Sequence, residues 1–259
     1  MKHANKKNRI CIFFVLPILF LIIGIAQNAL GAEDSRSVQK TVRRDNPKDL
    51  EDNHFSLEIS PCYYKYKTDS PAMYNLGLLF KADVGPGWEI SVGSDFITYQ
   101  NPDSGLSDLF LGAKYNFYDR DGLTMAFTGN ILFPTGNEAF REPGIEPTLA
   151  FLISRKLGDW EIGLTVGSTY QADEDGEPNY LDLEVSLELD YRLDEKNSFG
   201  VSVSGYGPDE RIGGSTRFET GMSYTRELTP NQSLGIILEK GFSGKKLDWS
   251  GTLVYNYTF

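Results

Sequence analysis

Hydrophobic and polar residues alternate strictly along residues 181–192, LDLEVSLELDYR. Leucine, valine and tyrosine occupy one parity, whereas four acidic residues, a serine and an arginine occupy the other. Successive side chains of a β-strand point to opposite sides, so this pattern predicts a strand with one apolar and one polar face. The alternation alone leaves open whether the apolar face contacts a protein core or lipid.

The same alternation recurs along most of the chain, with turn residues between the segments. Sustained helical periodicity is lacking, and 26 glycines disfavour long helices. The sequence therefore predicts an all-β protein. The expected strands are His54–Tyr66, Met73–Asp83, Trp88–Tyr99, Leu106–Phe117, Leu123–Phe133, Pro147–Arg155, Trp160–Tyr170, Tyr180–Arg192, Ser198–Tyr206, Thr216–Arg226, Ser233–Lys240 and Asp248–Phe259.

The connections between these strands alternate in length along the chain. Tight turns are expected at 84–87, 118–122, 156–159, 193–197 and 227–232. Longer links fall between them, at 134–146, 171–179, 207–215 and 241–247. Because strand direction alternates with the same period, short turns gather at one end and loops at the other. This arrangement predicts a transmembrane antiparallel up-and-down β-barrel of about 12 strands, with short periplasmic turns and longer external loops.

Strand height and register energy both favour lipid as the environment of the apolar face. Leu181 to Tyr191 spans ten rises of about 3.4 Å, and a tilt near 40° leaves roughly 26 Å along the barrel axis. The apolar band of outer-membrane barrels is about 25 Å tall. A slip by one residue would move four acids into hydrocarbon, at a cost on the order of 10 kcal/mol. The acids are therefore expected to face inward.

Aromatic residues gather at the strand ends next to the short turns. Trp88 and Trp160 open strands directly after such turns, and Tyr115, Phe117 and Tyr191 close strands before them. Aromatic side chains are favoured at the membrane–water interface, so this placement also indicates a membrane barrel.

The final strand ends in LVYNYTF, with Tyr257 and Phe259 on its apolar face. A terminal alternating strand that closes on phenylalanine resembles the signal recognised by the bacterial barrel-assembly machinery. We therefore expect that machinery to be a partner of the chain.

The N-terminal region indicates export. Basic residues precede an apolar run at 10–26, and small residues follow at 28–32, which is the order of a secretory signal peptide. Cleavage is expected after Gly31 or Ala32, although a retained anchor is the alternative. The expected organisation is a signal peptide at 1–32, a polar and flexible periplasmic lead-in at 33–53 and a transmembrane β-barrel at 54–259, located in the outer membrane of a Gram-negative bacterium.

Composition excludes several classes of function. Signal removal takes away four basic residues, so the net charge falls from −11 to −15 and disfavours phosphate-mediated binding of nucleic acid. Cys62 is the only cysteine of the mature chain, which excludes an internal disulfide, and its role is left open. His54 is its only histidine, and no activated serine motif accompanies it. We therefore expect no enzyme activity, no metal site and no cofactor.

Parity places a mixed but mainly acidic set of side chains on the inward face. In one interpretation these charges pair across strands and fill the interior. In the other they line a narrow aqueous passage, because twelve strands lie between small filled barrels and open porins. The candidate lumen-lining residues are Asp108, Lys114, Glu161, Asp182, Glu184, Glu188, Asp190, Arg192, Arg217, Glu219 and Glu239.

Two stretches carry a resemblance to a known family. Residues 105–117 are GLSDLFLGAKYNF, and residues 132–138 are LFPTGNE. They resemble the meta-pathway of phenol degradation family of outer-membrane transporters, whose members carry a GLGD-strand-G-x-K-Y stretch and a strand ending in PTG. Ser107 stands where glycine is usual. The loop at 134–146 either folds inward to narrow the mouth or forms a plain hairpin rim.

The resemblance implies an outer-membrane channel or transporter-like barrel for small solutes, including apolar or aromatic compounds. Its expected partners are outer-membrane lipid, the assembly machinery and the solute itself. The alternative function is a non-conducting barrel that serves as a structural or surface-display protein. Conductance in planar bilayers separates the two.

Overall fold

The computed structural model describes residues 55–66, 71–172, 180–209, 215–242 and 247–259, so the expected signal peptide, the lead-in and His54 lie outside the described residues. Within this part of the chain, strands dominate and a single 3-10 helix, η1 (Glu138–Phe140), is present. The strands are β1 (Phe55–Tyr66), β2 (Met73–Gly85), β3 (Trp88–Gln100), β4 (Asp103–Leu106), β5 (Leu109–Arg120), β6 (Leu123–Phe133), β7 (Glu146–Leu157), β8 (Trp160–Gln171), β9 (Tyr180–Arg192), β10 (Asn197–Asp209), β11 (Ser215–Thr229), β12 (Gln232–Gly241) and β13 (Leu247–Thr258).

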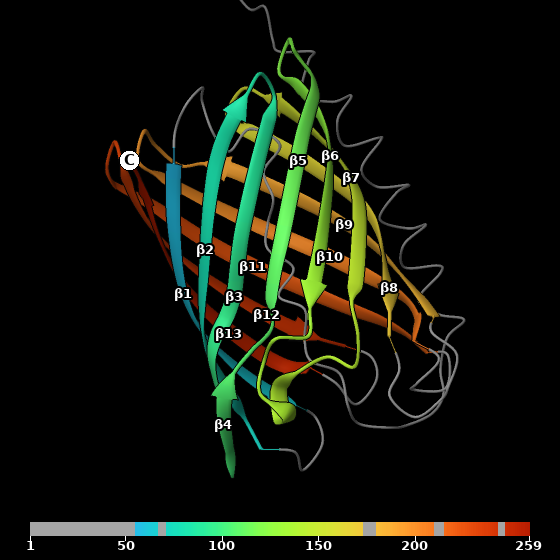
Figure 1. The fold of residues 1–259 in the computed structure, drawn as a ribbon. Coiled ribbons are helices and arrows are strands. Elements are labelled where there is room, and N and C mark those ends of the chain that lie inside the picture. Colours follow the sequence, from blue (N-terminus) through green and yellow to red (C-terminus); the bar gives the residue numbers. More distant parts are fainter. Residues whose placement is uncertain (1–54, 67–70, 173–179, 210–214, 243–246) are drawn as a thin grey trace, which may run out of the picture.

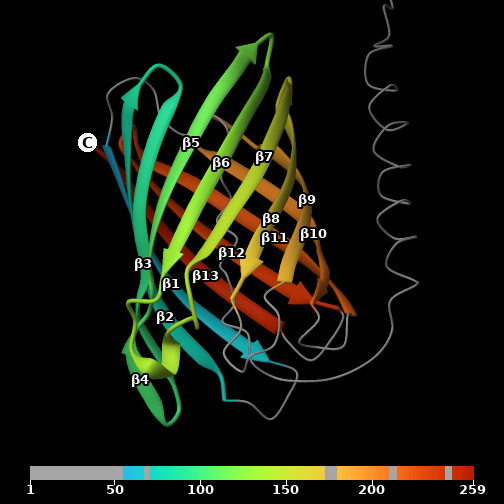
Figure 2. The ribbon, with the colours of Figure 1, turned by 45° about the vertical axis from the view of Figure 1, so that its right-hand side comes forward.

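The strands form a closed antiparallel barrel. Each spanning strand pairs with its neighbours in sequence, and β1 pairs with both β2 and β13, which closes the ring. Figures 1 and 2 show the result as two walls of tilted strands that cross each other. Twelve strands make up the wall, because the short strand β4 pairs only with the last residues of β3 and does not span the barrel. The predicted fold is confirmed, and closure leaves no strand edge unpaired in the ring.

One predicted strand is wrong. The sequence predicts a continuous strand over Leu106–Phe117, but the structure breaks it at Ser107 and Asp108. Leu106 belongs to β4, which forms a short hairpin with the end of β3, whereas β5 begins at Leu109 and pairs with the earlier part of β3. β4 and β5 thus pair with successive parts of β3, and the two-residue break separates the short hairpin at the loop end from the strand that spans the wall.

The turn end and the loop end differ as predicted. Tight turns join β2 to β3, β5 to β6 and β7 to β8, and each contains a glycine with positive φ: Gly87 at 75°, Gly122 at 72° and Gly158 at 68°. These left-handed conformations disfavour side chains with a Cβ, so glycine suits the positions. The start of β1 and the end of β13 also meet at the turn end, where the Phe259 N–H donates to the Phe55 carbonyl at 2.8 Å.

The outer surface is apolar and the inner surface is polar. Along β9, Leu181 is 55 % exposed whereas Asp182 beside it is 9 % exposed. Aromatic pairs lie on the outside near the turns, as the sequence predicts. Trp88 stacks on Tyr115 with ring centroids 4.6 Å apart, and the Trp160 ring lies 4.5 Å from that of Tyr191. Within the described residues, no helix has the length and hydrophobicity to cross a membrane.

Candidate functional site

The interior of the barrel is the candidate functional site, and strand register determines which side chains reach it. Thr165 of β8 pairs with Ser186 of β9, which pairs with Ser204 of β10, which in turn pairs with Glu219 of β11. Because paired residues share a face of the sheet, this row defines the inward parity of four neighbouring strands. The residues of that parity include Glu161, Asp182, Glu184, Glu188, Asp190, Arg217 and Glu219.

An arginine links two strands that are not neighbours. Arg217 of β11 donates to the Asp182 carboxylate of β9 at 2.8 Å, reaching across β10. Its guanidinium also lies 4.8 Å from the ring centroid of Tyr206, the β10 residue between them. Both charged side chains are mostly buried, so this pair is screened little by solvent. The contact joins the inward faces of β9 and β11, which carry most of the acidic side chains named above, near the loop end.

A second buried pair lies on the opposite wall. The Lys114 ammonium of β5 is 3.4 Å from the Glu89 carboxylate of β3, and both side chains are under 10 % exposed. These residues are register partners, so the strands themselves bring the charges together. Burying two charges carries a desolvation cost that their attraction offsets only when the pair stays intact. Removing one partner alone is therefore expected to be costly.

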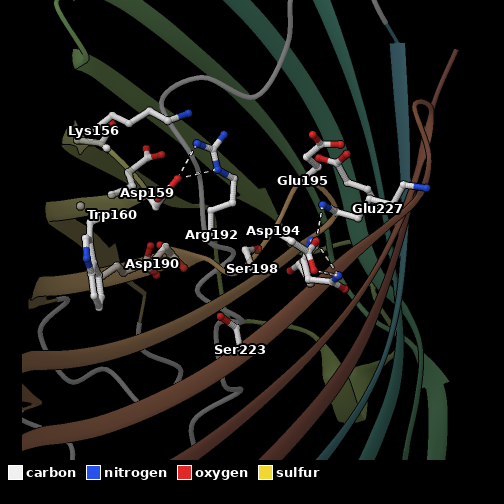
Figure 3. Close-up of a pocket in the computed structure, with 18 of the residues that line it drawn as sticks. Lys156, Asp159, Trp160, Asp190, Arg192, Asp194, Glu195, Ser198, Ser223 and Glu227 are labelled. Atoms are coloured by element: carbon white, nitrogen blue, oxygen red, sulfur yellow. Dashed lines mark hydrogen bonds and ion pairs between the residues drawn. The ribbon is translucent and has the colours of Figure 1, made fainter.

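Near the turn end the interior opens into a cavity of about 420 Å³, which we call the turn-end cavity (Figure 3). Acidic side chains outnumber basic ones in its lining. Arg192 bonds the Asp159 carboxylate at 2.8 Å and is half exposed at the rim. The acidic members are Asp159, Glu161, Glu188, Asp190, Asp194, Glu195 and Glu227, and the basic members are Lys156, Arg192 and Lys196. A solute at this end therefore meets a negative surface potential.

Asp194 orders the turn that borders this cavity. Its carboxylate accepts hydrogen bonds from the backbone N–H groups of Lys196 and Asn197 and from the Asn197 side-chain amide. These bonds favour the charged form, the Lys196 backbone bond most, and they lower the pKa of Asp194 below its usual value. The carboxylate therefore stays ionised and adds to the negative charge at neutral pH.

One part of the interior is less polar. Cys62, Tyr64, Met73 and Leu247 form a buried cluster on β1, β2 and β13 near the loop end, with Tyr66 packed against it. The Cys62 thiol lies 2.6 Å from the Thr252 hydroxyl, so the free cysteine is hydrogen-bonded inside the barrel. The interior thus combines a charged wall with an aromatic and sulfur-containing patch.

The loop between β6 and β7 is fixed to the barrel by Asp108. One carboxylate oxygen accepts the Gly136 N–H and the other accepts the Glu142 N–H, each at 2.7 Å. Asp108 is 5 % exposed, and Phe140 and Glu142 within the loop are also buried. The loop therefore packs against the rest of the protein instead of forming a plain hairpin rim.

Further bonds join the two motifs that carry the family resemblance. The Asn137 N–H donates to the Leu106 carbonyl at 2.8 Å, and the Leu106 N–H donates to the Asn137 side chain. Thr135 accepts the Leu109 N–H at 2.9 Å. A Cβ on Gly136 would lie 2.7 Å from the Leu106 carbonyl oxygen, so the close approach requires glycine there. We call this contact between residues 105–109 and 134–142 the loop anchor.

The structure places the candidate lumen residues in three groups. Most lie on the inward parity of the strands, including Lys114 beside Glu89 and Glu239, which accepts a 2.7 Å bond from Ser250. Arg192 lies at the rim. Asp108 lies outside any strand and anchors the loop. Sequence reasoning missed Tyr206, although it shares the inward parity of Ser204. The alternation of apolar and polar residues assigns tyrosine to the apolar face, which conceals an inward tyrosine.

The described residues contain no group of three or more His, Cys, Asp or Glu side chains placed to hold a metal ion.

The family described as "Putative MetA-pathway of phenol degradation" matches residues 38–258. The chain belongs to this family. A comparison with curated protein sequences found no match.

Solved structures share the barrel. An outer membrane channel from Pseudomonas putida F1 superposes with a TM-score of 0.67 at 14 % identity, covering 84 % of this chain and 100 % of the channel. The KdgM porin gives a TM-score of 0.55 at 9 % identity, covering 78 % and 99 %. A second KdgM structure, in complex with disordered oligogalacturonate, gives 0.56 at 8 % identity over the same shares. At these identities the likeness concerns the fold.

Proposed function

We propose that this member of the phenol-degradation family is an outer-membrane channel for the passage of small solutes. The observation that carries the proposal is the closed ring of twelve strands, which is apolar outside and polar inside. Only closed barrels and helices satisfy all backbone hydrogen bonds within a bilayer. A polar interior in such a barrel supports an aqueous route.

The interior also bears on the class of solute. The side chains proposed to line the route are Lys114, Glu161, Asp182, Glu184, Glu188, Asp190, Arg192, Arg217, Glu219 and Glu239, and acids predominate among them. This charge balance favours cationic or neutral solutes over anions. The family description supports apolar or aromatic compounds, for which Tyr64, Tyr66 and Tyr206 supply inward ring surfaces.

A non-conducting barrel is the second candidate function. The cross-strand pair of Arg217 with Asp182 and the buried pair of Lys114 with Glu89 favour it, because paired charges also fill an interior. In that case the barrel would act as a structural or surface-display protein and not as a channel. We propose that it has no enzymatic activity in either case.

Single-channel recording of the purified, refolded chain in planar bilayers tests the proposal. Discrete conductance steps support a channel, and block of the current by a panel of aromatic and charged solutes would identify the class that enters. Folding is checked independently by heat-modifiable electrophoretic migration. The non-conducting alternative would be established by two results together. The correctly folded barrel shows no conductance steps, and a strain that lacks the gene takes up solutes as the wild type does.

Export and assembly are part of the same proposal. We propose that residues 1–32 are removed as a signal peptide, that 33–53 form a periplasmic lead-in, and that Tyr257 and Phe259 are recognised by the barrel-assembly machinery. The two rings are in contact, with centroids 4.8 Å apart, and thus present one aromatic surface at the end of β13. Mass measurement of the protein purified from membranes tests the cleavage site.

A further inference from the structure

Register and alternation place five charged residues on the outward face of the spanning strands among the side chains that the structure describes, and all five are basic. Asp248 stands at the register irregularity of β13 opposite Lys65 and Tyr66, where alternation assigns no face, and its carboxylate contacts the outward Lys240. The chain contains 36 acidic and 25 basic residues, so composition alone does not explain this selection. The five are Lys65, Arg120, Arg155, Arg226 and Lys240.

These cations divide between the two ends of the barrel. The three arginines lie beside the short turns, each near the end of its strand. The two lysines lie at the loop end, and both flank the same tryptophan. Lys65 of β1 and Lys240 of β12 are the register partners of Trp249 of β13, one on each side. The lysine pair is thus a local feature of three adjacent strands.

The geometry of this group suits a single anionic headgroup. Neighbouring strands are about 4.8 Å apart, so the two lysine Cα atoms are separated by roughly 10 Å across β13. Two extended lysine side chains reach a common point over that span. Trp249 between them is 48 % exposed, and the Lys240 ammonium lies 4.6 Å from its ring centroid.

Asp248 is the acidic residue that contacts the group. It bonds the Lys240 ammonium and so holds that side chain against the Trp249 ring. An ammonium has three N–H donors, so this bond leaves others to point away from the barrel. Lys65 is exposed on the opposite side of the tryptophan. The group therefore keeps a net positive charge beside an apolar, lipid-facing wall.

We propose that Lys65, Lys240 and Trp249 bind the phosphate of a phosphorylated glycolipid in the outer leaflet. The inference rests on the proposed outer-membrane location, which turns the loop end toward the leaflet that carries such lipids. Charge-assisted bonds from two ammonium groups hold the phosphate, and the tryptophan ring lies at the level where headgroups meet acyl chains. The site is on the outer wall and does not involve the solute route.

Native mass spectrometry of the full mature barrel in detergent tests the proposal. The probes are bis-phosphorylated lipid A, enzymatically dephosphorylated lipid A and phosphatidylglycerol. We expect the wild type to retain the phosphorylated glycolipid at least five-fold more than either other probe. Lys65→Gln with Lys240→Gln should abolish that preference, whereas Arg155→Gln with Arg226→Gln, a matched loss of two outward cations at the other end, should keep it.

Further variants separate binding from folding and from channel function. Lys65→Gln alone leaves the Lys240–Asp248 contact intact and should lower retention at least two-fold. Lys65→Arg with Lys240→Arg keeps both charges and should retain the lipid. Conductance in phosphatidylcholine bilayers should be the same for all variants. A barrel that binds the lipid but shows no conductance would refute the proposed channel function and leave the lipid site standing. Equal retention of phosphatidylglycerol, or an unchanged preference in the double glutamine variant, would overturn the lipid site.

Discussion

Replacing Asp108 with alanine should release the loop between β6 and β7. The carboxylate accepts two backbone N–H groups at 2.7 Å, from Gly136 and Glu142, and Asp108 and Glu142 are themselves buried. A hydrogen bond to a charged group contributes about 1.5–3 kcal/mol, and a buried donor left without a partner adds a desolvation cost. The two bonds together therefore hold the loop by roughly 3–6 kcal/mol.

Trypsin cleavage at Arg141 measures the opening of this loop, because Arg141 is exposed between the anchored residues. Cleavage of a transiently open segment follows its population, and each 1.4 kcal/mol changes that population about tenfold. Asp108→Ala should therefore raise the cleavage rate by at least about a hundredfold. Asp108→Asn keeps one acceptor oxygen and should give an intermediate rate.

Asp103→Ala is the matched control, because Asp103 is an exposed acid on β4, the strand that directly precedes Asp108. It should leave cleavage at Arg141 unchanged. Electrophoretic migration of the unheated protein checks that each variant still forms the barrel. If Asp108→Ala is folded and is cleaved no faster than wild type, the carboxylate does not hold the loop and the loop anchor is wrongly assigned.

Three further experiments test other parts of the barrel. Asp190→Asn removes one charge from the turn-end cavity and should lower cation preference, measured as a smaller reversal potential in a salt gradient. Arg217→Ala should reduce the free energy of unfolding in urea by about 3–5 kcal/mol, whereas Arg217→Met combined with Asp182→Asn should cost less. Gly158→Ala, in open space at φ 68°, should cost about 1–2 kcal/mol, and Gly87→Ala should cost more, because its Cβ would lie 2.5 Å from a β5 carbonyl oxygen.

Strand parity could be predicted from the sequence because lipid and water impose it on every strand. Leu181 and Asp182 differ in exposure as the alternation requires. The break before β5 had a sequence signal as well: Leu106 occupies an even position, whereas all apolar residues from Leu109 to Phe117 except Phe110 occupy odd ones. That change of phase at Ser107 and Asp108 marks the end of one strand and the start of another.

The contacts of the site could not be predicted in the same way. Asp108 bonds residues 28 and 34 positions further along the chain, and these partners depend on how the loop folds back. Arg217 reaches Asp182 across an intervening strand, so their contact depends on two strand registers and on side-chain length. Alternation fixes which face a residue occupies, but it does not fix which of several charges on that face will pair.

Register shifts in the barrel occur near strand ends, and a physical reason follows from the same parity. One extra residue reverses the faces of all residues beyond it, which in mid-strand would place polar groups in hydrocarbon. Near an end the reversal instead adds outward aromatic surface. The shift in β5 leaves both Phe117 and Tyr118 exposed, and Phe117 stacks on Phe127 at 5.2 Å. Phe96 and Ile97 are likewise both outward near the loop end of β3, where Phe96 adopts φ 33°. Irregular pairing thus enriches the two interfacial levels at which aromatic rings stabilise a membrane barrel.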